Sequence, residues 1–157
     1  MLNIRTVAAL VITLIAATQT LQAADAQWRT DVGPAYQEAL KKSQPLVVLF
    51  TSANCHYCQE LKRDVIDSGA LKPLASQAIF VLADTQRDDK FRNVATMQSS
   101  LRIARFPTLV VLMPANKKLE DKGHMEGYDS PANYLSRLKA LLPKPATAAK
   151  PAAAPAK

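Results

Sequence analysis

The chain has 157 residues and a formal net charge of +7, from 20 basic and 13 acidic residues. The basic residues are scattered apart from a few near the C-terminus, so the charge is typical of a solvated surface and argues against a nucleic-acid-binding stripe. This length supports one domain rather than two, with an apolar core large enough to need no additional disulfides.

Residues 1–26 have the pattern of a secretory signal peptide. Arg5 precedes an apolar run from Val7 to Ala17, and Ala24-Asp25-Ala26 fits the cleavage motif, with cleavage after Ala23 as an alternative. An uncleaved anchor is less favoured, because a membrane span needs roughly 20 apolar residues. We therefore expect an exported protein, whose cysteines meet an environment in which disulfides persist.

Residues 27–142 are expected to form one domain of alternating helices and strands. Its first half is predicted to begin with a helix within Trp28–Lys42, with Pro34 near the first turn. Trp28 is expected to pack against the domain. The elements predicted next are a buried strand at Leu46–Phe50, a helix that ends near Ser68, one or two helical turns at Leu71–Ala75 and a buried strand at Ile79–Ala83.

The second half of the domain follows the same alternation. The predicted elements are a polar turn at Thr85–Lys90, a helix at Phe91–Leu101, a strand at Leu109–Met113, a turn at Pro114–Lys117, an edge strand at Leu119–Glu126 and a last helix that ends at about Leu142. Ser130 is a good N-cap for that helix, and Pro131 suits its first position. Residues 143–157 contain only Pro, Ala, Lys and Thr, which predicts a disordered, extended tail.

The two cysteines of the chain, Cys55 and Cys58, lie between the strand at Leu46–Phe50 and the helix that follows it. The unpaired N–H groups of a helix's first turn favour a thiolate, which is the form that attacks disulfides. The two cysteines are about one helical turn from each other, close enough to form a disulfide. We expect Cys55 to be the exposed attacking thiol and Cys58 the more buried thiol that resolves the mixed disulfide.

Three other uses of a Cys-x-x-Cys motif are less favoured. A structural zinc site usually has four ligands, and only His56 and His124 could complete one. Haem attachment needs a histidine directly after the second cysteine, where this chain has Gln59. An inert structural disulfide with so short a loop stabilises a fold little. We therefore predict redox chemistry and no metal, with His124 as a surface residue.

A second conspicuous stretch is Arg105-Phe106-Pro107-Thr108, which leads into the apolar strand at Leu109–Met113. Proline cannot donate a hydrogen bond to a sheet, so Pro107 marks a strand start, a bulge or a cis peptide bond. Arg105 either lies beside the site or is a solvated loop charge.

The order of these elements and motifs resembles a thioredoxin-like domain. The resemblance covers roughly Trp28 to Leu142 and rests on the last helix and on these residues: Phe50, Cys55-x-x-Cys58, Asp84, Phe106-Pro107-Thr108 and Gly127. It implies an α/β fold with a central mixed β-sheet flanked by helices. It also implies that Pro107 is a cis-proline facing the cysteines and that Phe106, Pro107 and Thr108 bind the substrate.

The chain departs from thioredoxins around the motif. Asn54 stands where they usually carry tryptophan, and Leu49 and Phe80 take the positions of a buried acid and its lysine partner. That acid is thought to accept the proton of the resolving thiol, so this chain lacks the acceptor. His56 and Tyr57, inside the motif, are expected to tune the site, because the histidine can carry a charge beside the first cysteine.

The resemblance implies an exported, periplasmic thiol–disulfide oxidoreductase, and it favours a reductase, because the chain lacks the helical insertion of related oxidants and the dimerisation domain of related isomerases. Its expected partners are exported proteins with disulfides or thiols and a membrane thiol-reductant donor. No cofactor is implied, and a monomer is expected. The alternatives are a disulfide oxidant or isomerase, and a redox-inactive binding module of the same fold.

Overall fold

The computed structural model describes residues 28–85 and 91–144. The predicted signal peptide, most of the predicted turn at Thr85–Lys90 and most of the predicted tail lie outside these ranges. Within the described ranges, no helix has both the length and the apolar character of a membrane span.

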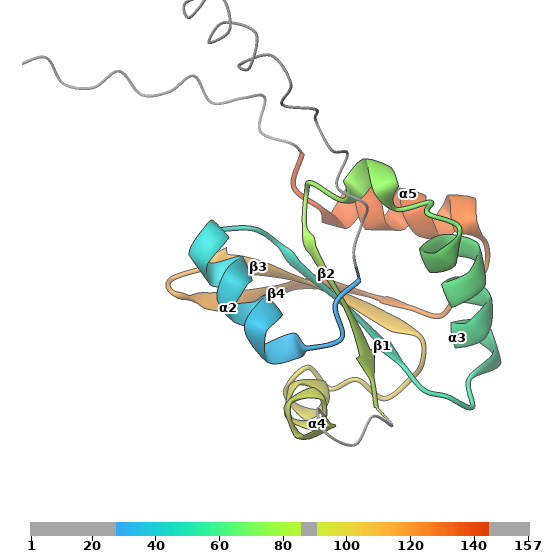
Figure 1. Cartoon of the computed structure of the whole chain (residues 1–157), viewed down its shortest axis with the longest axis horizontal. Coiled ribbons are helices and arrows are strands. Elements are labelled where there is room, and N and C mark those ends of the chain that lie inside the picture. The colour runs from blue at the N-terminus through green and yellow to red at the C-terminus, as the bar shows by residue number, and fades with distance from the viewer. Residues whose placement is uncertain (1–27, 86–90, 145–157) are drawn as a thin grey trace, which may run out of the picture.

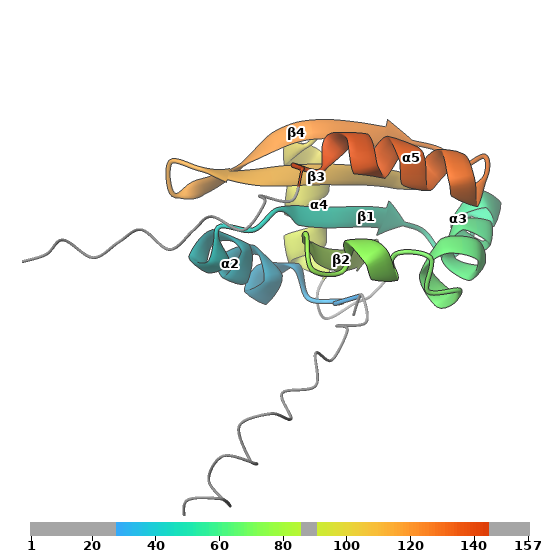
Figure 2. The same ribbon diagram turned by 90° about the horizontal axis from the view of Figure 1, so that it is seen from above.

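A four-stranded sheet forms the centre of the fold, with the strand order β2-β1-β3-β4, which can be followed in Figure 2. β1 (Leu46–Thr51) pairs in parallel with β2 (Ile79–Asp84) and antiparallel with β3 (Thr108–Ala115), which pairs antiparallel with β4 (Lys118–Glu126). All six residues of β1 are buried, because helices cover both faces of this central strand. The predicted α/β fold with a central mixed sheet is therefore confirmed.

The helices cover the two faces of the sheet in separate groups (Figure 1). α3 (His56–Leu61), its continuation η1 (Lys62–Asp67) and α5 (Pro131–Leu141) pack on one face, and α2 (Val32–Lys42) and α4 (Phe91–Ser100) pack on the other. Successive side chains of a strand point to opposite faces, so each strand contributes to two separate cores. The first core includes Val47, Leu49, Leu61, Val65 and Leu138, and the second includes Ala35, Leu46, Val48, Phe50 and Val94.

Side-chain caps set where α2 and α5 begin. Asp31 accepts a hydrogen bond from the N–H of Gly33 at 3.2 Å. Ser130 accepts one from the N–H of Asn133 at 3.4 Å, and Pro131 occupies the first helical position. Such caps satisfy N–H groups that have no partner inside the helix. The N-cap predicted for the last helix is confirmed by this contact.

The helix that follows β1 differs from the prediction in its hydrogen bonding. It is an α-helix only as far as Leu61 and a π-helix from Lys62 to Asp67, although it ends near Ser68 as predicted. Apolar spacing reports which face of a helix is buried, and it does not distinguish bonds to the fourth residue from bonds to the fifth. The short helical turn predicted after it is the 3₁₀-helix η2 (Lys72–Leu74).

The turn between β3 and β4 is shorter than predicted. Pro114 belongs to β3, where it pairs with Leu119, so the turn consists of Asn116 and Lys117 alone. These two residues have φ angles of 49° and 64°, which is the geometry of a two-residue hairpin turn. The proline is accommodated because it lies near the end of the strand, where a missing N–H interrupts little of the ladder.

The residues before α2 attach to the outer side of β2. Arg29 donates its N–H to the carbonyl of Phe80 at 3.0 Å and accepts a hydrogen bond from the N–H of Leu82 at 2.8 Å. The rings of Trp28 and Phe80 lie 5.3 Å apart. Trp28 therefore packs against the domain, as predicted.

The Arg29 side chain binds the carboxylate of Glu38 on α2, and this contact gives stability a dependence on pH. Hydrogen bonds from Arg29 and then Lys42 lower the pKa of Glu38 from 4.5 to about 2. A carboxyl group whose pKa falls on folding contributes its full stability above its unfolded pKa and loses it as the pH falls through its folded pKa. Between pH 4.5 and pH 2, the wild-type protein should therefore become less stable as acid is added.

We expect Glu38→Gln to remove this part of the acid sensitivity. Urea unfolding at about pH 5 and about pH 2.5 measures the loss of unfolding free energy on acidification, and this loss should be smaller in the variant than in the wild type. An equal loss in the two proteins would show that the contact with Arg29 does not contribute.

Candidate active site

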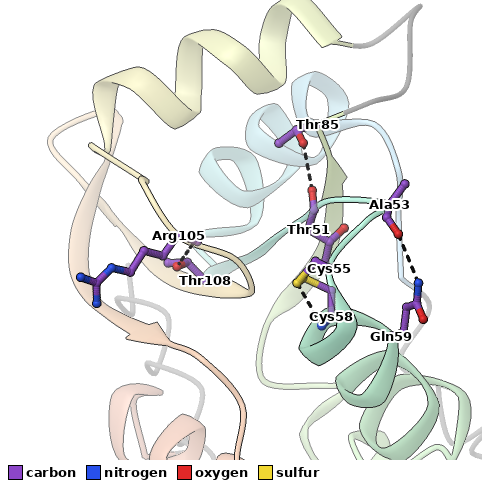
Figure 3. The surroundings of a disulfide bond; sticks show 8 residues. All are labelled: Thr51, Ala53, Cys55, Cys58, Gln59, Thr85, Arg105 and Thr108. Carbon is purple, nitrogen blue, oxygen red and sulfur yellow. Dashed lines mark hydrogen bonds between the residues drawn. A yellow bond between two sulfur atoms is a disulfide. The ribbon is translucent and has the colours of Figure 1, made fainter.

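A disulfide bond joins Cys55 and Cys58 directly after the C-terminal end of β1 (Figure 3). Cys55 is the N-cap residue of α3, and its Sγ accepts a hydrogen bond from the N–H of Cys58 at 3.2 Å. The Cα atoms of the two cysteines are 5.2 Å apart, within the usual range for a disulfide. The motif occupies this place because the strand ends at Thr51 and the helix begins at His56.

The two cysteines differ in their exposure to solvent. Cys58 is 4% exposed, whereas Cys55 is half-buried and reaches the surface. In the reduced protein, the N–H of Cys58 can donate to a thiolate at Cys55, and a hydrogen bond of this kind stabilises the ionised sulfur. The geometry therefore suits Cys55 to the attack on a disulfide.

Hydrogen bonds fix the end of β1 and the loop that leads from it to the motif. The N–H and the hydroxyl of Thr85 both donate to the carbonyl of Thr51, at 3.1 Å and 3.2 Å. The side-chain amide of Gln59 donates to the carbonyl of Ala53 at 3.2 Å, across the loop that leads to the first cysteine (Figure 3). These bonds hold the loop at residues 52–54 between the sheet and α3.

The segment before β3 lies beside the motif, because Thr108 pairs with Phe50 in the last part of β1. Pro107 and Thr108 are buried and Phe106 is half-buried. The Phe106–Pro107 peptide bond is cis. The segment that the sequence analysis singled out thus lies at the same end of the sheet as Cys55.

Two further hydrogen bonds fix this segment. The hydroxyl of Thr108 donates to the carbonyl of Arg105 at 2.8 Å, and the carbonyl of Pro107 accepts a bond from the N–H of Gly127 at 2.9 Å. The side chain of Arg105 is 80% exposed and lies 3.8 Å from Glu126. In Figure 3 it points away from the cysteines. Of the two predictions for Arg105, the structure therefore favours a solvated loop charge.

The two residues inside the motif are exposed, and one of them has an ionic partner. The side chains of His56 and Tyr57 are 77% and 57% exposed, and their rings lie 5.7 Å apart. Nε2 of His56 is 3.3 Å from Oε1 of Glu60. Sequence analysis missed Glu60, although its spacing of four residues from the histidine on a helix is the signal that could have found it.

The sheet is apolar at the positions where thioredoxins carry the acid and the lysine. Leu49 and Phe80 are 1% and 2% exposed. The register pairs Leu49 with Leu82 and Phe80 with Val47, so Leu82 rather than Phe80 lies directly opposite Leu49. Each of these residues is apolar, and none supplies a charge.

The zinc alternative finds no support in residues 28–85 and 91–144. No three histidine, cysteine or acidic side chains there are grouped so that they could hold a metal ion. His124 is on β4, where its ring lies 2.6 Å from Asp121, and it is an exposed residue.

Comparisons with known proteins agree with this geometry. A family model described as thioredoxin-like matches residues 27–114. A thioredoxin from Thermus thermophilus is 20% identical, with a TM-score of 0.62 and matches covering 74% of this chain and 87% of that chain. DsbH oxidoreductase is 18% identical, with a TM-score of 0.61 and coverages of 82% and 96%. No curated protein sequence matches significantly.

A thioredoxin-like fold with a Cys-x-x-Cys disulfide at the start of a helix is the arrangement of a thiol–disulfide oxidoreductase. At their level of identity, the solved structures support the fold alone. The family model goes further, because it matches the sequence itself over more than half of its length. This chain belongs to the thioredoxin-like family.

Proposed function

We propose that this protein is an exported thiol–disulfide oxidoreductase that reduces disulfides in other exported proteins. The observation that carries the proposal is the difference between its two cysteines. Cys55 reaches the surface and accepts the N–H bond, whereas Cys58 is buried. A dithiol in which one thiol attacks and the other resolves needs this difference.

The exchange takes place in two steps. The Cys55 thiolate attacks one sulfur of a client disulfide, the client S–S bond breaks, and the other client sulfur leaves as a thiolate and takes up a proton. Cys58 then loses its proton to solvent and attacks Sγ of Cys55, so that the mixed disulfide breaks and the second client thiolate leaves. Two electrons have then passed to the client, and Cys55 and Cys58 have formed a disulfide.

A reductase role is favoured over an oxidant role. Related oxidants carry a helical insertion, and the elements described in residues 28–85 and 91–144 include none. The signal-peptide pattern of residues 1–26 supports export to the periplasm. A reductase there has to be reduced again, so we propose a membrane thiol-reductant donor as its second partner. The working unit in this proposal is a monomer, and the cysteines themselves hold the electrons without a cofactor.

Reduction of insulin by dithiothreitol tests this activity. The wild-type protein should accelerate the precipitation of the reduced insulin chains, and Cys55→Ser should not. Cys58→Ser is the matched control, because it keeps the attacking thiol and should accumulate the mixed disulfide. A wild-type rate no higher than that of dithiothreitol alone would favour the redox-inactive binding module.

A redox titration against glutathione tests the direction. A reductase should have a potential near that of thioredoxin, about −270 mV, and a disulfide oxidant one near that of DsbA, about −120 mV. A value close to the second figure would reject the reductase role and leave the exchange chemistry intact.

We further propose that Phe106, Pro107 and Thr108 contact the client. This segment lies beside the end of β1, close in the fold to the loop that bears Cys55. The backbone ahead of a strand can pair with an extended client segment as an added strand. Such pairing would bring a client disulfide to the attacking thiol.

Pro107→Ala should weaken this contact and lower the rate of insulin reduction several-fold. Pro107 is buried, so the loss of its ring removes packing from this loop, while the backbone bond from Gly127 and the two cores are retained. Thermal unfolding should remain a single cooperative transition. An insulin rate equal to that of the wild type would contradict a role for this segment in client binding.

A further inference from the structure

A row of alternating charges follows the first cysteine along α3 and η1. Nε2 of His56 lies 3.3 Å from Oε1 of Glu60. One turn further, Nε of Arg63 lies 2.7 Å from Oδ1 of Asp64. The hydroxyl of Tyr128, from the segment between β4 and α5, donates to Oδ2 of Asp64 at 3.1 Å. The two ion pairs follow one another along the helix, and Tyr128 binds the second of them.

Glu60 is the member of this row that contacts the histidine. Its side chain is 31% exposed, compared with 77% for His56, so the carboxylate is the more fixed of the two. Arg63 and Tyr128 also interact electrostatically with Glu60. Asp64 engages both of these groups directly, and the ion pair found for Glu60 within residues 28–85 and 91–144 is the one with His56.

The direction of the His56–Glu60 contact matters for the chemistry at the first cysteine. Cys55 immediately precedes His56, the first helical residue, and Glu60 lies one helical turn after His56. A cation near the thiolate stabilises the reduced dithiol and makes the disulfide more oxidising. A carboxylate that holds this cation on the next turn reduces its effect on the sulfur, by distance and by its own opposite charge.

We propose that Glu60 is a positioning residue of the redox site, which holds the charged His56 ring one turn away from Cys55 and thereby keeps the disulfide less oxidising than its His-Tyr dipeptide would otherwise make it. This inference rests on the proposed exchange at Cys55. The other charged groups near the row include Lys62 on η1 and two ion pairs: Arg63 with Asp64, and Arg105, on the segment before β3, with Glu126. Burial and the bond to Asp64 raise the pKa of Tyr128 to about 12, so Tyr128 stays an uncharged donor throughout the tested range.

The expected result is a change in the equilibrium between the protein and glutathione. In that equilibrium the protein disulfide and two reduced glutathiones give the protein dithiol and one oxidised glutathione. At about pH 6, Glu60→Gln should make the disulfide roughly two- to fivefold easier to reduce. At about pH 8 the change should be smaller, because the carboxylate attracts only the protonated form of an imidazole.

A double-mutant cycle tests whether Glu60 acts through the histidine. His56→Gln should make the disulfide harder to reduce, and Glu60→Gln added to it should have a small effect that is the same at both pH values. Asp121→Asn is the matched control, because it removes a carboxylate that pairs with the other histidine, His124, on β4. This control should leave the equilibrium with glutathione unchanged.

Equal effects of Glu60→Gln in the wild-type and His56→Gln backgrounds would overturn the proposal, as would no effect in either. The pH profile of the thiolate absorbance at Cys55 gives a second reading, since the pKa of the thiol should fall in Glu60→Gln. The experiment separates this role from the proposed function. The predicted pattern with glutathione, together with inactivity toward insulin, would reject the client activity and support the role of Glu60.

Discussion

Iodoacetamide is expected to alkylate Cys55 of the reduced protein roughly 10- to 100-fold faster than Cys58. Only the thiolate reacts, and the N–H of Cys58 stabilises a thiolate at Cys55. Cys58 is 4% exposed, so the reagent reaches its sulfur only when the structure opens. Mass spectrometry of the two labelled sites over time measures both rates.

The protein unfolded in urea is the control for this experiment. Without the helix and the core, the two thiols should react at similar rates, so a difference that persists in urea has a cause other than the fold. Equal rates in the folded protein, or faster labelling of Cys58, would contradict the assignment of the attacking thiol.

Leu49→Asp is expected to lower the free energy of unfolding by about 3–5 kcal/mol near neutral pH. Leu49 is 1% exposed, and Leu82 lies opposite it on β2, so the new carboxylate would be buried without a partner. Burial raises the pKa of such a group above its unfolded value. The loss of stability should therefore be smallest below the unfolded pKa and increase as the pH rises.

Urea unfolding at about pH 4 and about pH 7 measures this loss, and Leu49→Met is the control, because a swap of similar volume should cost less than about 1.5 kcal/mol. The double variant with Leu82→Lys should recover part of the stability, since the register places the two charges opposite each other. A Leu49→Asp protein as stable as the wild type would show that this position is reached by water.

Much of the fold could be predicted because the central strands are short apolar runs bounded by breakers. The strands predicted at Leu46–Phe50 and Ile79–Ala83 each end one residue short of β1 and β2. The hairpin was harder to predict, because its turn at Asn116 and Lys117 contains no glycine and Pro114 resembles the start of a turn. Pairing with β4 extends β3 to Ala115, and pairing across a sheet is a tertiary effect that local composition does not report.

For the candidate site, the sequence predicted where the Cys-x-x-Cys motif lies in the fold but not which residues contact it. The spacing of Cys55 and Cys58 and the place of the motif after a buried strand are local properties. The contact between His56 and Glu60 depends on the rotamer of an exposed side chain. The residue opposite Leu49 depends on the register between β1 and β2. Counting along the sequence pointed to Phe80 as the partner position, and only the parallel pairing identifies Leu82.

The attachment of Arg29 to β2 also bears on how this protein behaves at high concentration. An edge strand with free N–H and C=O groups can take up a strand from another molecule and begin to aggregate. Arg29 already occupies such groups on Phe80 and Leu82. The opposite edge strand, β4, carries exposed charged side chains that disfavour pairing with another strand, namely Lys118, Glu120, Asp121 and Lys122. Both edges of the sheet thus discourage edge-to-edge pairing between copies of this chain.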